Sequence, residues 1–162
     1  MTLRDKPTLP GNEIYHMKIA IKYGLMITLV VVIWVLITHF LFPISPESKI
    51  NIVGPILFNL AAIVAIYLGV KSRDDVSALS FKEGLKTGVS ISFVYTLSAS
   101  LFFFGLFLFI GPQLMANEPM AQNYPVWQRA LVAFAGLFFG ALILGLVYST
   151  IISFLLVRRT RS

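Results

Sequence analysis

The stretch LKTGVSISFVYTLSASLFFFGLFLFI, residues 85–110, decides the fold of this chain. It contains a single charged side chain, that of Lys86, next to its first residue. About 20 apolar residues in a helix are enough to cross the hydrocarbon core of a bilayer. The regular alternation of polar and apolar residues that marks a membrane β-strand is absent from it. The stretch therefore predicts a membrane-spanning helix.

Hydroxyl groups are frequent in the first half of this stretch. On a helix they divide between two nearly opposite sides, which carry Thr87, Ser90 and Ser98 on one and Ser92, Thr96 and Ser100 on the other. A helix that lines a pore is expected to have one polar side. Hydroxyls on two sides instead suit hydrogen bonds to neighbouring helices or to the carbonyl four residues back. We interpret this helix as the central contact element of a bundle, and a lining for a solute path is the alternative.

Three further apolar runs are long enough to span a bilayer. With the first stretch, they cover about residues 19–42, 50–70, 85–110 and 130–157. Charged residues make up 12% of the chain, about half the fraction of a soluble domain. The link between the first two runs is short, which favours antiparallel neighbours. The sequence therefore predicts an all-α membrane protein, with four transmembrane helices in an up-down-up-down bundle.

The basic residues indicate the orientation of this bundle. Eleven of the 13 lysines and arginines fall on one side of the predicted membrane: Arg4, Lys6, Lys18, Lys22, Lys71, Arg73, Lys82, Lys86, Arg158, Arg159 and Arg161. Only Lys49 and Arg129 fall on the other side. By the positive-inside rule, both termini are expected in the cytoplasm (N-in/C-in). Because the basic residues flank apolar runs and form no stripe, they do not indicate nucleic-acid binding.

Two local patterns divide the chain further. Residues 1–16, which include the segment TLPGNE, are expected to be a disordered or leader segment before a single four-helix transmembrane domain at residues 17–162. Ser80, followed three residues later by Glu83, fits a capping box. This pair predicts that the third helix begins near Phe81.

Two passages carry a resemblance to a known family. They are KYGLMITL, residues 22–29, and LGVKSRDDVSALSFKEGLKTG, residues 68–88. Together they resemble a family of small four-helix bacterial inner-membrane proteins classed only as a domain of unknown function. The resemblance would cover about residues 17–157. It implies the four-helix topology and a bacterial inner membrane, and it implies no catalytic residues.

Small residues recur four positions apart in the last three predicted helices, a pattern that lets helix backbones approach closely. The candidate packing residues are Ala61, Ala65, Gly69, Gly84, Gly88, Ser92, Thr96, Ser100, Gly136, Gly140 and Gly145. The pattern alone does not decide whether they join helices of one chain or of two.

Aromatic residues gather in the half of the membrane away from the predicted cytoplasmic side. The run Phe102, Phe103, Phe104, Phe107 and Phe109 is a candidate contact for lipid tails, an isoprenoid, a pigment or a partner helix. Asn59 lies near the middle of the second span, where an amide must find hydrogen-bond partners. We expect it to bond a serine or a tyrosine such as Tyr95, and a polar contact to a ligand is the alternative.

Several classes of function are not expected. The chain has no cysteine, no charged residue in the middle of a span and no motif of an intramembrane hydrolase or metal site. We therefore expect no catalytic residue, cofactor or metal. The sequence favours a non-catalytic accessory or scaffolding subunit of a larger membrane complex, in contact with membrane lipids and other membrane protein subunits. The alternative is a small oligomeric transporter or channel for an uncharged solute.

Overall fold

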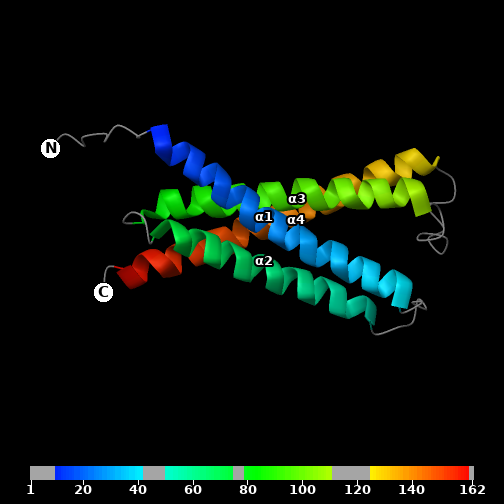
Figure 1. Ribbon diagram of the computed structural model, residues 1–162, viewed down its shortest axis with the longest axis horizontal. Helices are drawn as coiled ribbons and strands as arrows, with labels where there is room; N and C mark the ends of the chain where they lie inside the picture. Colours follow the sequence, from blue (N-terminus) through cyan, green and yellow to red (C-terminus); the bar gives the residue numbers. More distant parts are fainter. Residues whose placement is uncertain (1–9, 42–49, 75–78, 111–124, 161–162) are drawn as a thin grey trace.

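The computed structural model describes residues 10–41, 50–74, 79–110 and 125–160, and within these ranges it contains four α-helices and no strand. They are α1 (Pro10–Leu41), α2 (Ile50–Asp74), α3 (Phe81–Ile110) and α4 (Val126–Thr160). Each is long and apolar enough to cross a membrane. The helices alternate in direction, so that α1 begins and α4 ends at the same end of the bundle (Figure 1). We call this the terminal end and the opposite one the far end. The predicted four-helix architecture is confirmed.

The beginning of α1 differs from the sequence-based expectation. The helix starts at Pro10, so residues 10–16, which the sequence places in a disordered or leader segment, form helical turns. Proline suits the first position of a helix, where the missing N–H has no acceptor to lose. Tyr15 packs against the core, and the Nδ1 atom of His16 lies 3.1 Å from the hydroxyl oxygen of Thr87 on α3. These contacts extend the helix beyond the apolar run. Residues 1–9 lie outside the described part of the chain.

The capping box at the start of α3 is confirmed. The hydroxyl of Ser80 donates to a carboxylate oxygen of Glu83 at 2.8 Å, and the backbone N–H of Ser80 donates to the same oxygen at 3.2 Å. In return, the backbone N–H of Glu83 donates to the Ser80 hydroxyl at 3.3 Å. These bonds satisfy amide groups that would otherwise lack partners in the first turn. They fix the point at which α3 enters the bundle.

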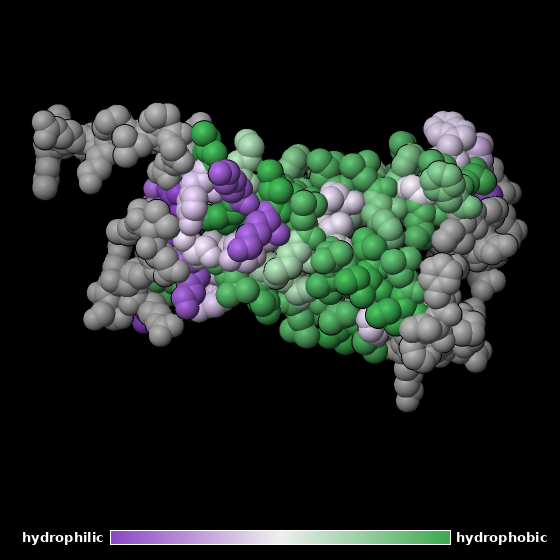
Figure 2. All heavy atoms as spheres, in the orientation of Figure 1, coloured by the Kyte–Doolittle hydropathy of each residue, from purple (hydrophilic) through white to green (hydrophobic). Residues whose placement is uncertain are grey.

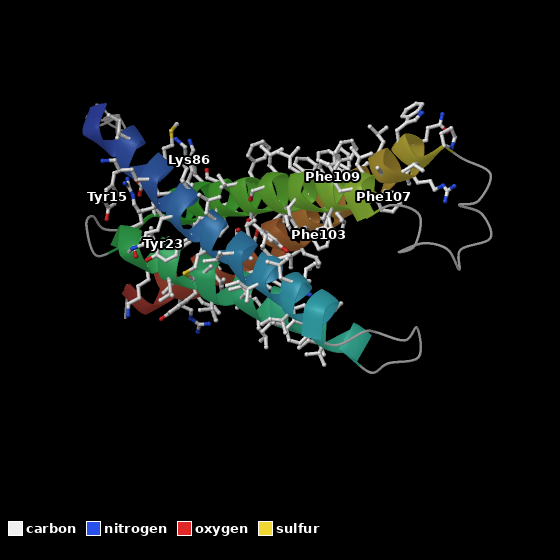
Figure 3. The ribbon with its side chains drawn as sticks, turned by 45° about the vertical axis from the view of Figure 1, so that its right-hand side comes forward. Tyr15, Tyr23, Lys86, Phe103, Phe107 and Phe109 are labelled. Carbon is white, nitrogen blue, oxygen red and sulfur yellow. The ribbon has the colours of Figure 1, made fainter. Side chains whose placement is uncertain are left out.

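Helix α3 is the central element, because it packs against each of the other three helices. Helix α1 crosses it at Gly24, where a Cβ atom would lie only 2.7 Å from Val94. Beside this crossing, the hydroxyls of Thr28 and Ser98 are 2.6 Å apart. Most of the apolar core lies in the half of the bundle nearer the terminal end. Toward the far end, α1 and α2 together diverge from α3 and α4 (Figures 1 and 3).

A ladder of glycine–serine contacts joins α3 to α4. Its three rungs are Gly84 with Ser153, Gly88 with Ser149, and Ser92 with Gly145. Each step moves four residues forward on α3 and four residues back on α4, as antiparallel helices require. A Cβ atom at Gly88 would lie 2.6 Å from the Oγ of Ser149 and 3.2 Å from its Cα. Only glycine permits this backbone approach.

The surface is apolar along most of the length of the bundle. Hydrophilic residues gather toward the terminal end, and a continuous apolar region covers the middle of the face in view (Figure 2). Large apolar side chains are exposed on all four helices, for example Leu29, Leu60, Leu101 and Ile143. Such a surface is compatible with lipid and not with water. The chain is a multi-pass membrane protein.

Candidate functional site: an intramembrane cavity

A cavity begins where the ladder between α3 and α4 ends. It has a volume of about 370 Å³ and lies between α2, α3 and α4, with Val31 of α1 at its wall. The residues one rung beyond Ser92 and Gly145 are Thr96 and Ala141, and both line it. Its size is within the range of sites that bind small molecules. The cavity is the candidate functional site.

Small side chains and helix divergence together explain this space. Gly136 and Gly140 line the cavity from α4, and a Cβ atom on either would meet nothing within 4 Å. This contrasts with Gly84, Gly88 and Gly145, which the ladder encloses. Because α2 has moved away at this level, no large side chain fills the space beside the two open glycines.

The open side of the cavity lies between α2 and α4. Five of its lining residues are exposed on the surface: Pro55 on α2, and the two open glycines, Leu137 and Leu144 on α4. All of these residues lie within the candidate membrane spans. We therefore expect the opening to face lipid, so that a molecule dissolved in the membrane could enter from the side.

Asn59 and Tyr148 form a hydrogen-bonded bridge across the cavity wall. The hydroxyl of Tyr148 on α4 donates to the side-chain oxygen of Asn59 on α2 at 2.7 Å. The side-chain amide of Asn59 also donates to the carbonyl of Pro55, one turn earlier, at 2.7 Å. The expectation that a tyrosine bonds Asn59 is therefore confirmed, but the tyrosine is Tyr148 and not Tyr95. Tyr95 lies on α3 and lines the same cavity.

The three hydroxyls on the cavity side of α3 are not equally satisfied. Ser92 donates to the carbonyl of Gly88 at 2.9 Å, and Thr96 donates to that of Phe93 at 3.1 Å. The hydroxyl of Ser100 has no partner among the described residues, although its side chain is only 2% exposed. Buried hydroxyls in proteins nearly always have partners, so Ser100 is an exception that requires an explanation.

The hydroxyls on the opposite side of α3 face α1. Ser98 contacts Thr28, Thr87 contacts His16, and Ser90 lines a separate cavity between α1 and α3. The division of the hydroxyls between two sides of α3, predicted from the sequence, thus corresponds to two different neighbours. One side holds α1, and the other forms the wall of the candidate site.

The phenylalanine run of α3 occupies several environments (Figure 3). Phe103 lines the cavity, and Phe107 is only 5% exposed and therefore unavailable to an outside partner. Phe102 makes an edge contact with Phe103, and Phe104 makes one with Phe134 of α4. Phe109, at 92% exposed, is the member of the run that is free for lipid or a partner. The run is therefore not a single contact surface.

The remaining candidate packing residues lie within the bundle. Ala61 and Ala65 belong to the core region of α2, and a Cβ atom on Gly69 would meet Ile91 and Tyr23. The sequence left open whether the small residues join helices of one chain. For most of them the partner helix is in the same chain, and the open pair on α4 is the exception.

Two important residues were not identified from the sequence. Tyr148 is one of several aromatic residues in an apolar run. Its contact with Asn59 depends on where α2 lies beside α4, which the sequence does not indicate. Arg73 follows the predicted span 50–70, but it is buried at the end of α2, with its guanidinium 3.8 Å from the Glu83 carboxylate. The capping box, which fixes the position of Glu83, was the available signal for this second contact.

The lining determines what the cavity can do chemically. Among its described residues there is no aspartate, glutamate, histidine, lysine or arginine. In the described part of the chain, no group of three or more histidine, aspartate or glutamate side chains is placed to hold a metal. The functional groups that the cavity offers are hydroxyls and one carboxamide in an apolar wall. This arrangement suits binding of an uncharged molecule.

A comparison with family models gives one match. The model described as "Protein of unknown function (DUF4199)" matches residues 22–123. The match includes most of α1, all of α2 and α3, and the segment after α3, and it stops before α4. No curated protein and no solved structure matches the chain.

Proposed function

The chain belongs to this family of proteins of unknown function, which assigns it no activity, and from the geometry of the cavity we propose a binding role. The protein is a non-catalytic membrane protein that holds an uncharged, lipid-soluble molecule between α2, α3 and α4. The observation that carries this proposal is a cavity of about 370 Å³ whose open side includes Gly136 and Gly140 of the apolar helix α4. Isoprenoids and pigments are among the compounds of this class.

The volume and the lining of the cavity support a small molecule as its occupant. A volume of about 370 Å³ is within the range of pockets that hold small molecules. The apolar walls from Phe58, Ala99 and Leu144 favour such a ligand over water.

We further propose that the protein acts as an accessory subunit of a larger membrane complex. Phe109, near the far end of α3, and Phe139, further into the bundle on α4, are exposed to its surroundings. Large aromatic side chains of this kind are frequent in contacts between membrane-embedded subunits and in contacts with lipid. The bound molecule would then be held for use by the complex.

A transporter for an uncharged solute is the second candidate, and the hydroxyls and Asn59 in the cavity wall are the observation in its favour. Passage across the membrane would require an opening toward the terminal end. The ladder at Gly84 and Gly88 closes that route between α3 and α4. Solute uptake into proteoliposomes would favour this candidate over the accessory role.

The proposed location is the bacterial inner membrane, with both termini in the cytoplasm. The distribution of charge supports this orientation. Among the described residues, the lysines and arginines lie at the terminal end, with the exception of Arg129 near the start of α4. The positive-inside rule relates such an asymmetry to the cytoplasmic side.

The proposed function predicts that filling the open side of the cavity releases the ligand. Replacing Gly140 with leucine adds a side chain where nothing lies within 4 Å, so the bundle is expected to fold. Protein purified in a mild detergent is expected to retain an uncharged molecule, detected by solvent extraction and mass spectrometry. The Gly140→Leu variant is expected to retain at least ten times less.

The matched control for this experiment is Gly105→Leu. A Cβ atom added at Gly105 would also meet nothing within 4 Å, but Gly105 lies on α3 and does not line the cavity. The control is expected to retain the molecule as the unmodified protein does. Equal retention by both variants, or no bound molecule in the unmodified protein, would contradict the proposed function.

A further inference from the structure

We infer that the ligand is a neutral amphiphile, with an apolar chain or ring system and one uncharged oxygen group that accepts a hydrogen bond from Ser100. This inference rests on the proposed function and names the chemical class that the cavity selects. Fatty alcohols, quinones and diacylglycerols share this chemistry, because each has a hydroxyl or carbonyl oxygen without a charge.

The unpaired hydroxyl of Ser100 indicates that the ligand carries an oxygen that accepts a hydrogen bond. It belongs to a row in which Ser92 and Thr96 both donate to carbonyls of the preceding turn. Ser100 makes no such bond and has no other described partner, although it is almost fully buried at the cavity wall. In a membrane interior, a hydroxyl without a partner is costly. A ligand oxygen in the cavity supplies the missing acceptor.

Two further donors lie on the same cavity. The hydroxyl of Tyr95 makes no hydrogen bond to a described residue. The side-chain amide of Asn59 has two N–H groups, and only one bond from it, to the carbonyl of Pro55, is present. The oxygen of the same amide already accepts from Tyr148. The wall therefore has unused donor hydrogens on Ser100, Tyr95 and Asn59, and an accepting oxygen on the ligand can bond to them.

The absence of charge in the wall excludes charged headgroups. No lysine, arginine or histidine lines the described cavity to compensate a carboxylate or phosphate, and no aspartate or glutamate lines it to compensate an amine. An ion buried without a partner is strongly disfavoured. A phospholipid headgroup therefore does not fit, and the oxygen of a neutral lipid does.

The position of the polar groups also defines how the ligand lies. Ser100 is on α3, and the open side of the cavity lies across from it between Pro55 of α2 and Gly136 and Gly140 of α4. With its oxygen at Ser100, the ligand's apolar part passes the two glycines and leaves the cavity toward the lipid. The backbone of α4 can approach this part closely because neither glycine has a side chain.

A pair of probes with equal chain length tests this inference. The full chain in detergent micelles is incubated with radiolabelled 1-hexadecanol, and unlabelled 1-hexadecanol or hexadecane is added as competitor. For the unmodified protein, hexadecanol is expected to displace the label at a concentration at least three times lower than hexadecane. Replacing Ser100 with alanine is expected to weaken hexadecanol binding by about three- to twenty-fold, the range of single hydrogen bonds in membranes. Displacement by hexadecane is expected to remain unchanged.

The control variant is Ser90→Ala, the same substitution on the same helix at a position outside this cavity. This control is expected to bind both probes as the unmodified protein does. Tyr95→Phe provides a second test variant in the cavity wall. Equal displacement by the two probes, or unchanged hexadecanol binding in Ser100→Ala, would overturn the assignment of an oxygen-bearing ligand while leaving the proposed function intact. A lack of saturable binding of either probe would overturn both.

Discussion

Replacing Gly88 with leucine is expected to prevent α3 and α4 from packing. A Cβ atom at this position would lie 2.6 Å from the Oγ of Ser149, 2.7 Å from its Cβ and 3.2 Å from its Cα. The last of these belongs to the backbone, so a change of side-chain rotamer cannot relieve the overlap. Since this contact is the middle rung of the ladder, the whole interface between α3 and α4 must move apart.

The expected measurement is unfolding in sodium dodecyl sulfate, followed by circular dichroism. The Gly88→Leu variant is expected to yield little folded protein. The smaller change Gly88→Ala is expected to lower the free energy of unfolding by about 1–3 kcal/mol, as for other overpacked cores. Gly105→Leu and Gly105→Ala are the matched controls, because that glycine of α3 has open space. If Gly88→Leu unfolded at the same detergent fraction as Gly105→Leu, the ladder would not hold the bundle together.

The second large effect concerns the orientation in the membrane. Because the chain has no cysteine, single cysteines can be introduced as Lys82→Cys at the terminal end and Gln128→Cys at the far end. With both termini in the cytoplasm, a membrane-impermeant maleimide added to intact spheroplasts is expected to label only the cysteine at position 128. The physical reason is the excess of basic residues at the terminal end, which is retained in the cytoplasm during insertion.

Labelling after lysis provides the control for this experiment. Both cysteines are then expected to react, which shows that each is accessible to the reagent. Labelling of the cysteine at position 82 in intact spheroplasts, with protection of that at 128, would reverse the proposed orientation.

Local patterns in the sequence predicted those parts of the structure that local interactions determine. Ser80 and Glu83 are three residues apart on one turn, so their reciprocal bonds follow from the spacing alone. The glycines and serines of α3 and α4 recur every four residues, which predicts close helix contact although not its register. The beginning of α1 was missed, because its first turns are polar and are held by tertiary contacts such as that between His16 and Thr87.

The cavity could not be predicted for a related reason. It depends on how far α2 diverges from α4, and no residue pattern within a single helix encodes that distance. The same divergence decides that Tyr148, and not Tyr95, reaches Asn59. The sequence also could not predict that Gly136 and Gly140 have open space beside them. The spacing of a pair of small residues is the same whether or not a neighbouring helix covers the pair. About half of the lining residues, among them Asn59, Ser100 and Phe103, could be identified from the sequence, but not the fact that they enclose a space.

The central claim is that the space between α2, α3 and α4 holds a molecule that enters from the lipid. Photolabelling with a diazirine derivative of 1-hexadecanol, followed by tandem mass spectrometry of the cross-linked peptides, tests it most directly. We expect adducts on the buried cavity residues Ala99 and Ser100, and their loss in the Gly140→Leu variant. Adducts confined to lipid-exposed side chains such as Leu101 and Phe139, with the same pattern in both proteins, would contradict the claim.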